Sequence, residues 1–414
     1  MSETLGQRPW MIAAAPVMDA LEAAGGADCA RYVGGCVRNT LLGKPVSDID
    51  IATRLTPDQV TRALAAATLK AVPTGIEHGT VTAISGGKPF EITTLRRDLA
   101  TDGRHAVVAF TGDWGQDAQR RDFTLNALYA QRDGTLFDPT GHGVADCRAG
   151  RIVFVGEAEH RVREDYLRIL RFFRFFAWYG VGPADTAALA ACESLRGGLA
   201  TLSAERVSRE VLKLLGADDP REAVGLMART GVLGEVLPAP IDVARFEGLV
   251  VLEDETLFET DAVLRLAALL PDDPIGAVQL AERLRLSNAE RDRIAAALAP
   301  TPAFKSWMSP REIRRMLYKL GAQAFRDRAK LAWAQADRTA TTPQWRGMIA
   351  LGEGWIAPAF PLTGRDVIAA GAPMGPMVGQ VLREVEDWWI DHDFIDDRMS
   401  TIEKLKSVVQ GMAF

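Results

Sequence analysis

Two acidic residues stand one position apart in the segment SDIDIAT, which spans residues 47–53. The segment alternates as a β-strand does, so Asp48 and Asp50 are expected on one face and Ile49 and Ile51 on the buried face. Two carboxylates a few ångströms apart repel each other, and their arrangement becomes favourable when a divalent cation binds between them. Oxygen ligands alone favour Mg2+. For an isolated pair of acids, a solvated strand face is the alternative.

The stretch before the two aspartates is suited to binding phosphate. Gly34 and Gly35 allow a backbone to approach a ligand closely, and the helix predicted after them has N-terminal amides that attract anions. Arg38 is predicted about one turn into this helix, and Gly43 and Pro45 end it. The order of these features predicts a site with phosphate at one end and a metal at the other.

A later segment, EDYLRILRFFRFFAWYG at 164–180, is suited to reading a base. On a helix Asp165 and Arg168 are neighbours on one face. Their acceptor and donors match the N4 and N3 edge of cytosine and the N6 and N1 edge of adenine. Uracil and guanine would leave protein groups unpaired, at about 1–3 kcal/mol each. Arg171 and Arg174 continue the spacing, and Arg174, half a turn from Asp165, is expected at a phosphate or a neighbouring side chain. The core is expected to take Phe172, Phe173, Phe175 and Phe176.

The composition is that of an ordinary globular protein that lives in a reducing compartment. At 414 residues, with 48% apolar and 25% charged residues, the chain is expected to form two or more domains. A net charge of −6 argues against nucleic-acid binding through bulk charge. The four cysteines lack CxxC spacing, no convincing signal peptide is present, and no window approaches a membrane span, so a cytoplasmic location is predicted.

The pattern of apolar residues along the chain changes near Glu157. Residues 30 to about 155 contain β-like runs and read as α/β, whereas the remainder has the apolar periodicity of helices. The runs expected as strands include FEITTL, AVVAF, GTLFDPT and GRIVFVG. We therefore predict an α+β protein with a mixed α/β head followed by a helical body.

The motifs together carry a resemblance to a known family. VGGCVRN, LLGK and SDIDIAT resemble the opening motif of the class II tRNA nucleotidyltransferase and bacterial poly(A) polymerase superfamily. The resemblance implies a DNA polymerase β-like nucleotidyltransferase head with a mixed sheet over 1–155. It further implies a helical neck with a nucleotide-recognition helix over 156–260, and a body and tail over 261–414 that bind tRNA. Asn39 departs from the family, which commonly has Asp there, so its role is left open.

Two further motifs extend the resemblance. In EITTLRRD, Glu91 is a possible third metal ligand, and an ion pair with Arg96 or Arg97 is the alternative. RRDFTLNALY resembles the family's second motif, which implies that Arg121 binds the triphosphate and Asp122 a ribose hydroxyl. The alternative is that these two residues pair with each other or cap the next helix.

Three other segments carry weaker expectations. Residues 99–119 resemble the family's flexible loop, which accompanies the ability to complete a CCA end with adenosine. SAERVSREVLKLL resembles the fifth motif, whose Glu205, Arg206 and Glu210 are expected to stabilise the neck. A basic helical face is predicted to contact RNA backbone or to be simply solvated; it consists of Arg311, Arg314, Arg315 and Lys319.

The resemblance implies an enzyme that adds C, C and A to the 3′ end of tRNA from CTP and ATP, without a nucleic-acid template, and releases pyrophosphate. Mg2+ on Asp48 and Asp50 would assist transfer, Gly35, Arg38 and Arg121 would hold the triphosphate, and the EDxxR segment would act as the template for the base. A poly(A) polymerase, a CC-adding or A-adding enzyme, and a catalytically silent RNA-binding protein stay open as alternatives. Neither a membrane nor an obligate protein partner is implied.

Overall fold

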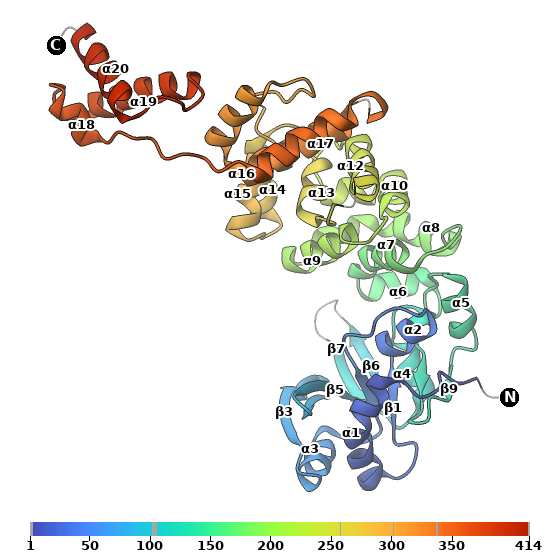
Figure 1. Ribbon diagram of the computed structural model, residues 1–414. Helices are drawn as coiled ribbons and strands as arrows, with labels where there is room; N and C mark the ends of the chain where they lie inside the picture. The colour runs from blue at the N-terminus through green and yellow to red at the C-terminus, as the bar shows by residue number, and fades with distance from the viewer. Residues whose placement is uncertain (1–2, 102–105, 257, 301, 337, 413–414) are drawn as a thin grey trace. The chain divides into compact units, whose positions relative to one another are not determined.

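The structure is a computed structural model that describes residues 3–101, 106–256, 258–300, 302–336 and 338–412. The chain divides into two compact units (Figure 1). The first comprises Met1–Ala239 with Arg283–Arg285, and the second comprises Pro240–Glu282 with Leu286–Phe414. The finer division into head, neck and body at residues 155 and 260 stays a prediction.

A seven-stranded mixed sheet forms the centre of the head. Its strands lie in the order β3-β4-β5-β2-β1-β8-β9. Only β2 and β5 pair in parallel, and the other neighbours are antiparallel. The bounds are β1 Ala30–Val33, β2 Asp50–Thr53, β3 Lys70–Gly75, β4 Thr80–Ser85, β5 Lys88–Thr94, β8 Tyr129–Ala130 and β9 Leu136–Phe137. A separate two-stranded sheet consists of β6 Arg96–Thr101 and β7 Ala106–Phe110.

Helices cover this sheet, and the strand predictions are largely confirmed. The head helices are α1 Pro9–Gly25, α2 Gly35–Leu41, α3 Pro57–Ala66, α4 Trp114–Gln119 and α5 Gly143–Ala149. Helices α1 and α3 pack against each other (Figure 1), and both pack against β4. FEITTL lies in β5 and AVVAF is β7, while GTLFDPT supplies only the two residues of β9.

The prediction of a strand at GRIVFVG is wrong. The run forms only an isolated bridge, between Phe154 and Phe123. Its apolar side chains instead enter the core, where the Phe154 ring packs 4.9 Å from that of Phe123 and 5.9 Å from that of Phe172. The run is therefore apolar because its side chains pack between Phe123 and Phe172 of α7, not because it forms a strand.

The remainder of the first unit is helical, as expected. Its helices are α6 Ala158–Glu164, α7 Leu167–Tyr179, α8 Thr186–Leu195, α9 Ala204–Leu215, α10 Arg221–Arg229 and α11 Val232–Val236. Helix α7 packs on α9. The four phenylalanines predicted for the core are all buried, with exposures of 6% or less. This packing fixes the polar face of α7 relative to α9.

The second unit is also helical. Its helices are α12 Val243–Thr256, α13 Ala262–Ala268, α14 Pro274–Arg283, α15 Asn288–Ala297, α16 Pro310–Gln335, α17 Arg338–Gly354, α18 Gly364–Ala369, α19 Pro376–Asp391 and α20 Arg398–Gly411. Gly321 has a left-handed φ of 76° and kinks α16. Across the described part of the chain, no helix combines the length and the apolarity that crossing a bilayer demands.

The basic face of α16 is engaged within this unit. Three of its cationic side chains form ion pairs with acids on α19 and just after it; the pairs are Arg314–Asp393, Arg315–Asp391 and Lys319–Asp387. Tyr318 donates a hydrogen bond of 2.6 Å to Glu386. The face predicted to contact RNA or solvent thus serves, at these positions, to hold α19.

Candidate active site

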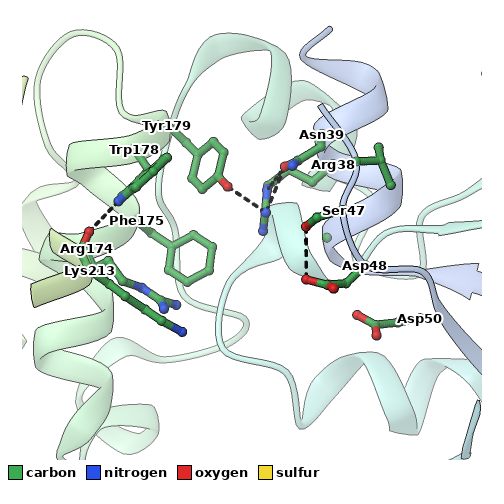
Figure 2. A pocket seen from close by; sticks show the side chains of 12 residues that line it. Arg38, Asn39, Ser47, Asp48, Asp50, Arg174, Phe175, Trp178, Tyr179 and Lys213 are labelled. Atoms are coloured by element: carbon green, nitrogen blue, oxygen red, sulfur yellow. Dashed lines mark hydrogen bonds between the residues drawn. The ribbon is translucent and has the colours of Figure 1, made fainter. Parts of the chain in front are cut away.

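Asp48 and Asp50 lie at the edge of the sheet that faces the neck helices. Strand β2 begins only at Asp50, so Asp48 belongs to the extended segment before the strand. Ile49 and Ile51 are buried, with exposures of 9% and 1%, as the alternation predicted. Figure 2 shows both carboxylates on one side of a cavity, opposite Arg174, Phe175 and Lys213.

The negative charge around Asp50 is only partly compensated. Burial, followed by the nearby carboxylate of Glu91, raises the pKa of Asp50 to about 6, with a further contribution from Asp48, while Arg121 and Arg38 offset part of the rise. Asp50 and Glu91 are register partners on β2 and β5. The Asp48 carboxylate accepts a hydrogen bond from Ser47 Oγ at 3.0 Å, and neither aspartate forms an ion pair within the described residues. This accumulation of negative charge suits a cation.

Glu91 does not complete a three-ligand cluster. Within residues 3–412 apart from the undescribed positions, no three or more His, Cys, Asp or Glu side chains are arranged to hold a metal ion. Glu91 is exposed, beside the buried Ile92. Its role as a third ligand stays a prediction.

Arg38 lies on α2, as predicted, and is 8% exposed. Its guanidinium donates to Asn126 Oδ1, to Asn39 Oδ1 at 2.9 Å and to the Tyr179 hydroxyl at 2.8 Å. Asn39 Nδ2 in turn donates to the Pro45 carbonyl at 2.8 Å. Asn39 therefore ties Arg38 to the segment that leads into Asp48. An aspartate at 39 would lack the donor to Pro45, which explains how asparagine serves here.

Arg121 is held by a residue that the sequence analysis missed. Its guanidinium donates to Asp117 Oδ2 at 3.0 Å and to the Tyr129 hydroxyl at 3.2 Å. Asp117 is 1% exposed and also binds Arg120. Although burial opposes ionisation, Arg121 and Arg120 lower the pKa of Asp117 to about 2. The i, i+4 spacing of Asp117 and Arg121 is the sequence signal that would have identified the pair.

Asp122 pairs with Arg171 and Arg121 pairs with Asp117, so the alternative that the two residues pair with each other is wrong. Asp122 accepts a hydrogen bond of 2.9 Å from Arg171 Nε, and its other oxygen accepts from Asn126 Nδ2 at 3.0 Å and from the Phe123 amide at 2.8 Å. Burial alone would raise the pKa of Asp122, but Arg171 and these hydrogen bonds lower it. Asp122 is thus a fixed anion that orients Arg171.

The helical geometry predicted for Asp165 and Arg168 needs correction. Helix α6 ends at Glu164, and Asp165 is extended, with φ −155° and ψ 106°, before α7 begins. Asp165 accepts from Arg206 Nη2 at 2.6 Å, whereas Arg168 pairs with Glu164 and donates to the Arg161 carbonyl at 2.7 Å. The two side chains are therefore fixed by separate partners.

Two cavities meet at Asp50. The first, of about 530 Å³, is lined by Gly35, Asp50, Asp122, Asn126, Asp165 and seven arginines, namely Arg38, Arg96, Arg120, Arg121, Arg168, Arg171 and Arg206. The second, of about 460 Å³, is lined by Gly35, Arg38, Asn39, Asp48, Asp50, Arg174, Phe175, Trp178, Tyr179 and Lys213. The cavities share Gly35, Arg38, Asp50 and Phe175. Most predicted site residues thus meet in the first cavity, which Arg206 also lines, beyond its expected role in the neck.

Arg174 lies elsewhere than the other arginines of α7. It lines the second cavity, where its Nε is 3.0 Å from Glu210 Oε2 and its guanidinium lies over the Phe175 ring. It does not line the first cavity, because it lies about a third of a turn round the helix from Arg168.

Comparison with known proteins agrees with this architecture. Two family models match the chain: "Poly A polymerase head domain" over residues 30–153, and "Probable RNA and SrmB- binding site of polymerase A" over residues 185–241. The mitochondrial CCA tRNA nucleotidyltransferase 1 of Mus musculus is 33% identical over 364 residues, which cover 87% of this chain and 82% of that protein. The chain belongs to the CCA tRNA nucleotidyltransferase family.

Other members of this family are similarly close. A CCA-adding enzyme of Latilactobacillus sakei is 29% identical, with 91% of this chain and 93% of that protein covered. The crystal structure of the Bacillus stearothermophilus CCA-adding enzyme in complex with CTP matches with a TM-score of 0.78 and 26% identity, covering 98% of this chain and 100% of that one. The resemblance carried by the sequence motifs and the α+β fold are thereby confirmed.

Proposed function

We propose that this protein adds C, C and A to the 3′ end of tRNA, taking the nucleotides from CTP and ATP and releasing pyrophosphate. The observation that carries the proposal is the first cavity, where seven arginines surround the space between Asp50 and the pair formed by Asp165 and Arg168. Such a site is complementary to a triphosphate at one end and to a base at the other. The similarity of this chain to CCA-adding enzymes over most of its length supports the same activity.

Asp48 and Asp50 are the proposed ligands of Mg2+. Their fit is supported by the raised pKa of Asp50, which reflects burial first and then the nearby carboxylates of Glu91 and Asp48. Mg2+ is commonly bound by one or two carboxylates together with substrate phosphates, so a third protein ligand is not required. When bound, the ion supplies activation of the primer 3′ hydroxyl and neutralisation of the leaving group.

The arginines of the first cavity are proposed to position the triphosphate. Arg38 and Arg121 present guanidinium groups whose orientation is fixed by Tyr179 and Asp117. Gly35 shares this edge of the cavity, where a side chain would narrow the approach. Asp122 already accepts four hydrogen bonds, from Phe123, Asn126 and Arg171, so it would accept a ribose hydroxyl by exchanging one of these donors. These groups hold the α-phosphate near the aspartates without a nucleic-acid template.

Asp165 and Arg168 are proposed to select the base. The Asp165 carboxylate accepts the exocyclic amino group of cytosine or adenine, and the Arg168 guanidinium donates to the adjacent ring nitrogen. Glu164 and the Arg161 carbonyl keep Arg168 in place. Uracil and guanine offer the reversed pattern, which leaves both protein groups unpaired at about 1–3 kcal/mol each.

An extension assay tests this function. Purified protein is incubated with a tRNA that lacks its last three nucleotides and with each nucleoside triphosphate, alone or in combination. Addition of C, C and A followed by a stop is expected. Long A tails would identify a poly(A) polymerase, and addition of only CC or only A would identify a CC-adding or an A-adding enzyme. No extension would identify a catalytically silent RNA-binding protein. Asp48→Ala and Asp50→Ala are expected to abolish addition, whereas Arg168→Ala mainly lowers the preference for CTP and ATP. Preserved preference in Arg168→Ala would overturn the base-selection assignment.

Partners and location complete the proposal. tRNA is proposed to bind through the body and tail, over residues 261–414. The cytoplasm is the proposed compartment, because Cys29, Cys36, Cys147 and Cys192 are all free and buried, as suits a reducing environment.

A further inference from the structure

We propose that the second cavity binds the 3′-terminal nucleotide of the RNA being extended, with Trp178 as a stacking surface and Lys213 as a phosphate contact. This inference rests on the proposed function, since it concerns the acceptor of the same transfer. The first cavity accounts for the incoming nucleotide, and nothing in that role uses Trp178 or Lys213. Both residues lie on the neck, at the ends of α7 and α9.

The position of the second cavity suits an acceptor hydroxyl. The cavity shares Asp50 with the first cavity and adds Asp48 (Figure 2). A ribose in the second cavity and an α-phosphate in the first can therefore both approach Asp50, while Asp48 lines the second cavity. This is the arrangement that displacement at phosphorus requires, because the 3′ oxygen forms a bond to the α-phosphorus as the bond to pyrophosphate breaks. The proton of the hydroxyl leaves toward Asp48 or Asp50.

The aromatic lining of the second cavity suits a base. Trp178 is 39% exposed, which is unusual for the largest side chain, yet its ring is fixed because Nε1 donates to the Lys213 carbonyl at 2.7 Å. Tyr179 is fixed by Arg38, and Phe175 lines the wall between the cavities. The exposed but immobile indole ring of Trp178 can stack with any base, as a primer whose last base changes from one addition to the next requires.

The cationic lining suits the backbone of that nucleotide. The Lys213 side chain is exposed, and its ammonium forms no hydrogen bond or ion pair with the residues that the structure describes. Arg174 reaches the same cavity from α7 (Figure 2). Because Arg174 is paired with Glu210, Lys213 is the group proposed to contact a phosphate in this cavity, beside Asp48 and Asp50. RNA rather than an apolar ligand is therefore the favoured occupant.

Trp178→Leu and Trp178→Phe are the matched variants for the stacking role. Leucine keeps bulk without a ring, phenylalanine keeps a ring, and both lose the hydrogen bond to the Lys213 carbonyl. With full-length protein, we expect Trp178→Leu to raise KM for tRNA roughly ten-fold and Trp178→Phe less than about three-fold. The dissociation constant for CTP, measured by calorimetry without tRNA, should stay within about two-fold for both variants. Equal defects in the two variants, an unchanged KM for tRNA in Trp178→Leu, or a matching loss of CTP binding would overturn the inference.

Lys213→Met and a cross-link test the same site independently. Lys213→Met should raise KM for tRNA and make it less dependent on salt, with Lys213→Arg close to the wild type. A tRNA that ends in 4-thiouridine should cross-link to residues 175–179 or 213, and a cross-link found only elsewhere would contradict the assignment. If the wild type adds C, C and A but these results fail, only this inference falls. If the wild type adds nothing, the proposed function itself is wrong.

Discussion

At the residue scale, Asp50 shows how the site opposes the stability of the protein. Its pKa is raised from 3.8 to about 6 in the folded chain, so the folded state binds a proton more tightly than the unfolded state does. The free energy of unfolding therefore falls as pH rises from about 4 to about 6, and the penalty is fully present above that range. The carboxylate is kept where it costs stability, which is expected of a group that serves chemistry.

Asp50→Asn tests this penalty. In EDTA, the variant should melt at a higher temperature than the wild type at pH 7.5 and at nearly the same temperature at pH 4, because asparagine resembles the protonated acid. Mg2+ should narrow the difference at pH 7.5 by stabilising only the wild type. Thermal unfolding at the two pH values measures both effects. An equal difference at pH 4 and pH 7.5 would show that ionisation of Asp50 is not the cause.

Asp117 makes the opposite prediction. Its pKa of about 2 means that its stabilising contribution is present above pH 4 and is lost as pH falls from about 4 to about 2. Asp117→Ala should cost about 3 kcal/mol at pH 7, since it leaves Arg120 and Arg121 without their buried acceptor, and it should raise KM for CTP and ATP. Urea unfolding and initial rates measure the two effects. Asp117→Asn, which keeps an acceptor, should be milder; equal stability of all three proteins would refute the role.

At the scale of elements, the break between α6 and α7 determines where Asp165 points. The residue leaves the helix, and its carboxylate is held by the Leu167 amide and by Arg206 of α9. A continuous helix would have turned Asp165 onto the face of Arg168, as the sequence spacing suggested. The break instead lets two helices aim their polar groups into one cavity.

Arg206→Ala should therefore reduce discrimination between bases more than it reduces turnover. We expect incorporation of UTP relative to CTP to rise roughly ten-fold, because a mobile Asp165 loses its fixed acceptor geometry. Arg285→Ala is the matched control, since it removes an exposed ion pair with Glu205, which lies on α9 as Arg206 does. Competition assays with mixed nucleotides give the ratio. A similar change in both variants would point to general loosening of α9.

The whole molecule shows which features a sequence reveals. The placement of Asp48, Asp50, Arg121 and Arg168 at the candidate site could be predicted because each belongs to a short motif whose chemistry is local. Their supporting contacts could not, because Tyr179 meets Arg38 across 141 positions of the chain. The prediction of a strand at GRIVFVG was wrong for a related reason, since a segment buried against a helix has the same apolar pattern as a strand. Part of the segment resembling the flexible loop, residues 102–105, lies outside the described residues.

The pairing of α16 with α19 belongs to the same scale, because it joins residues 68 to 79 positions apart within the second unit. Arg314 and Asp393 are 27% and 28% exposed, whereas Arg315 and Asp391 are 46% and 47% exposed. Less solvent screens the first pair, and Arg314 lowers the pKa of Asp393. Reversing the charge at Arg314 should therefore loosen α19 more than reversing it at Arg315.

Hydrogen exchange over α19 and α20 measures this loosening. Arg314→Glu should increase exchange several-fold at low salt, Arg315→Glu should change it little, and adding Asp393→Arg to Arg314→Glu should restore protection. At 1 M salt the differences should shrink, because screening acts within about 3 Å. If the two single variants behaved alike, or if the double variant stayed loose, apolar packing of α19 rather than these ion pairs would hold the tail in place.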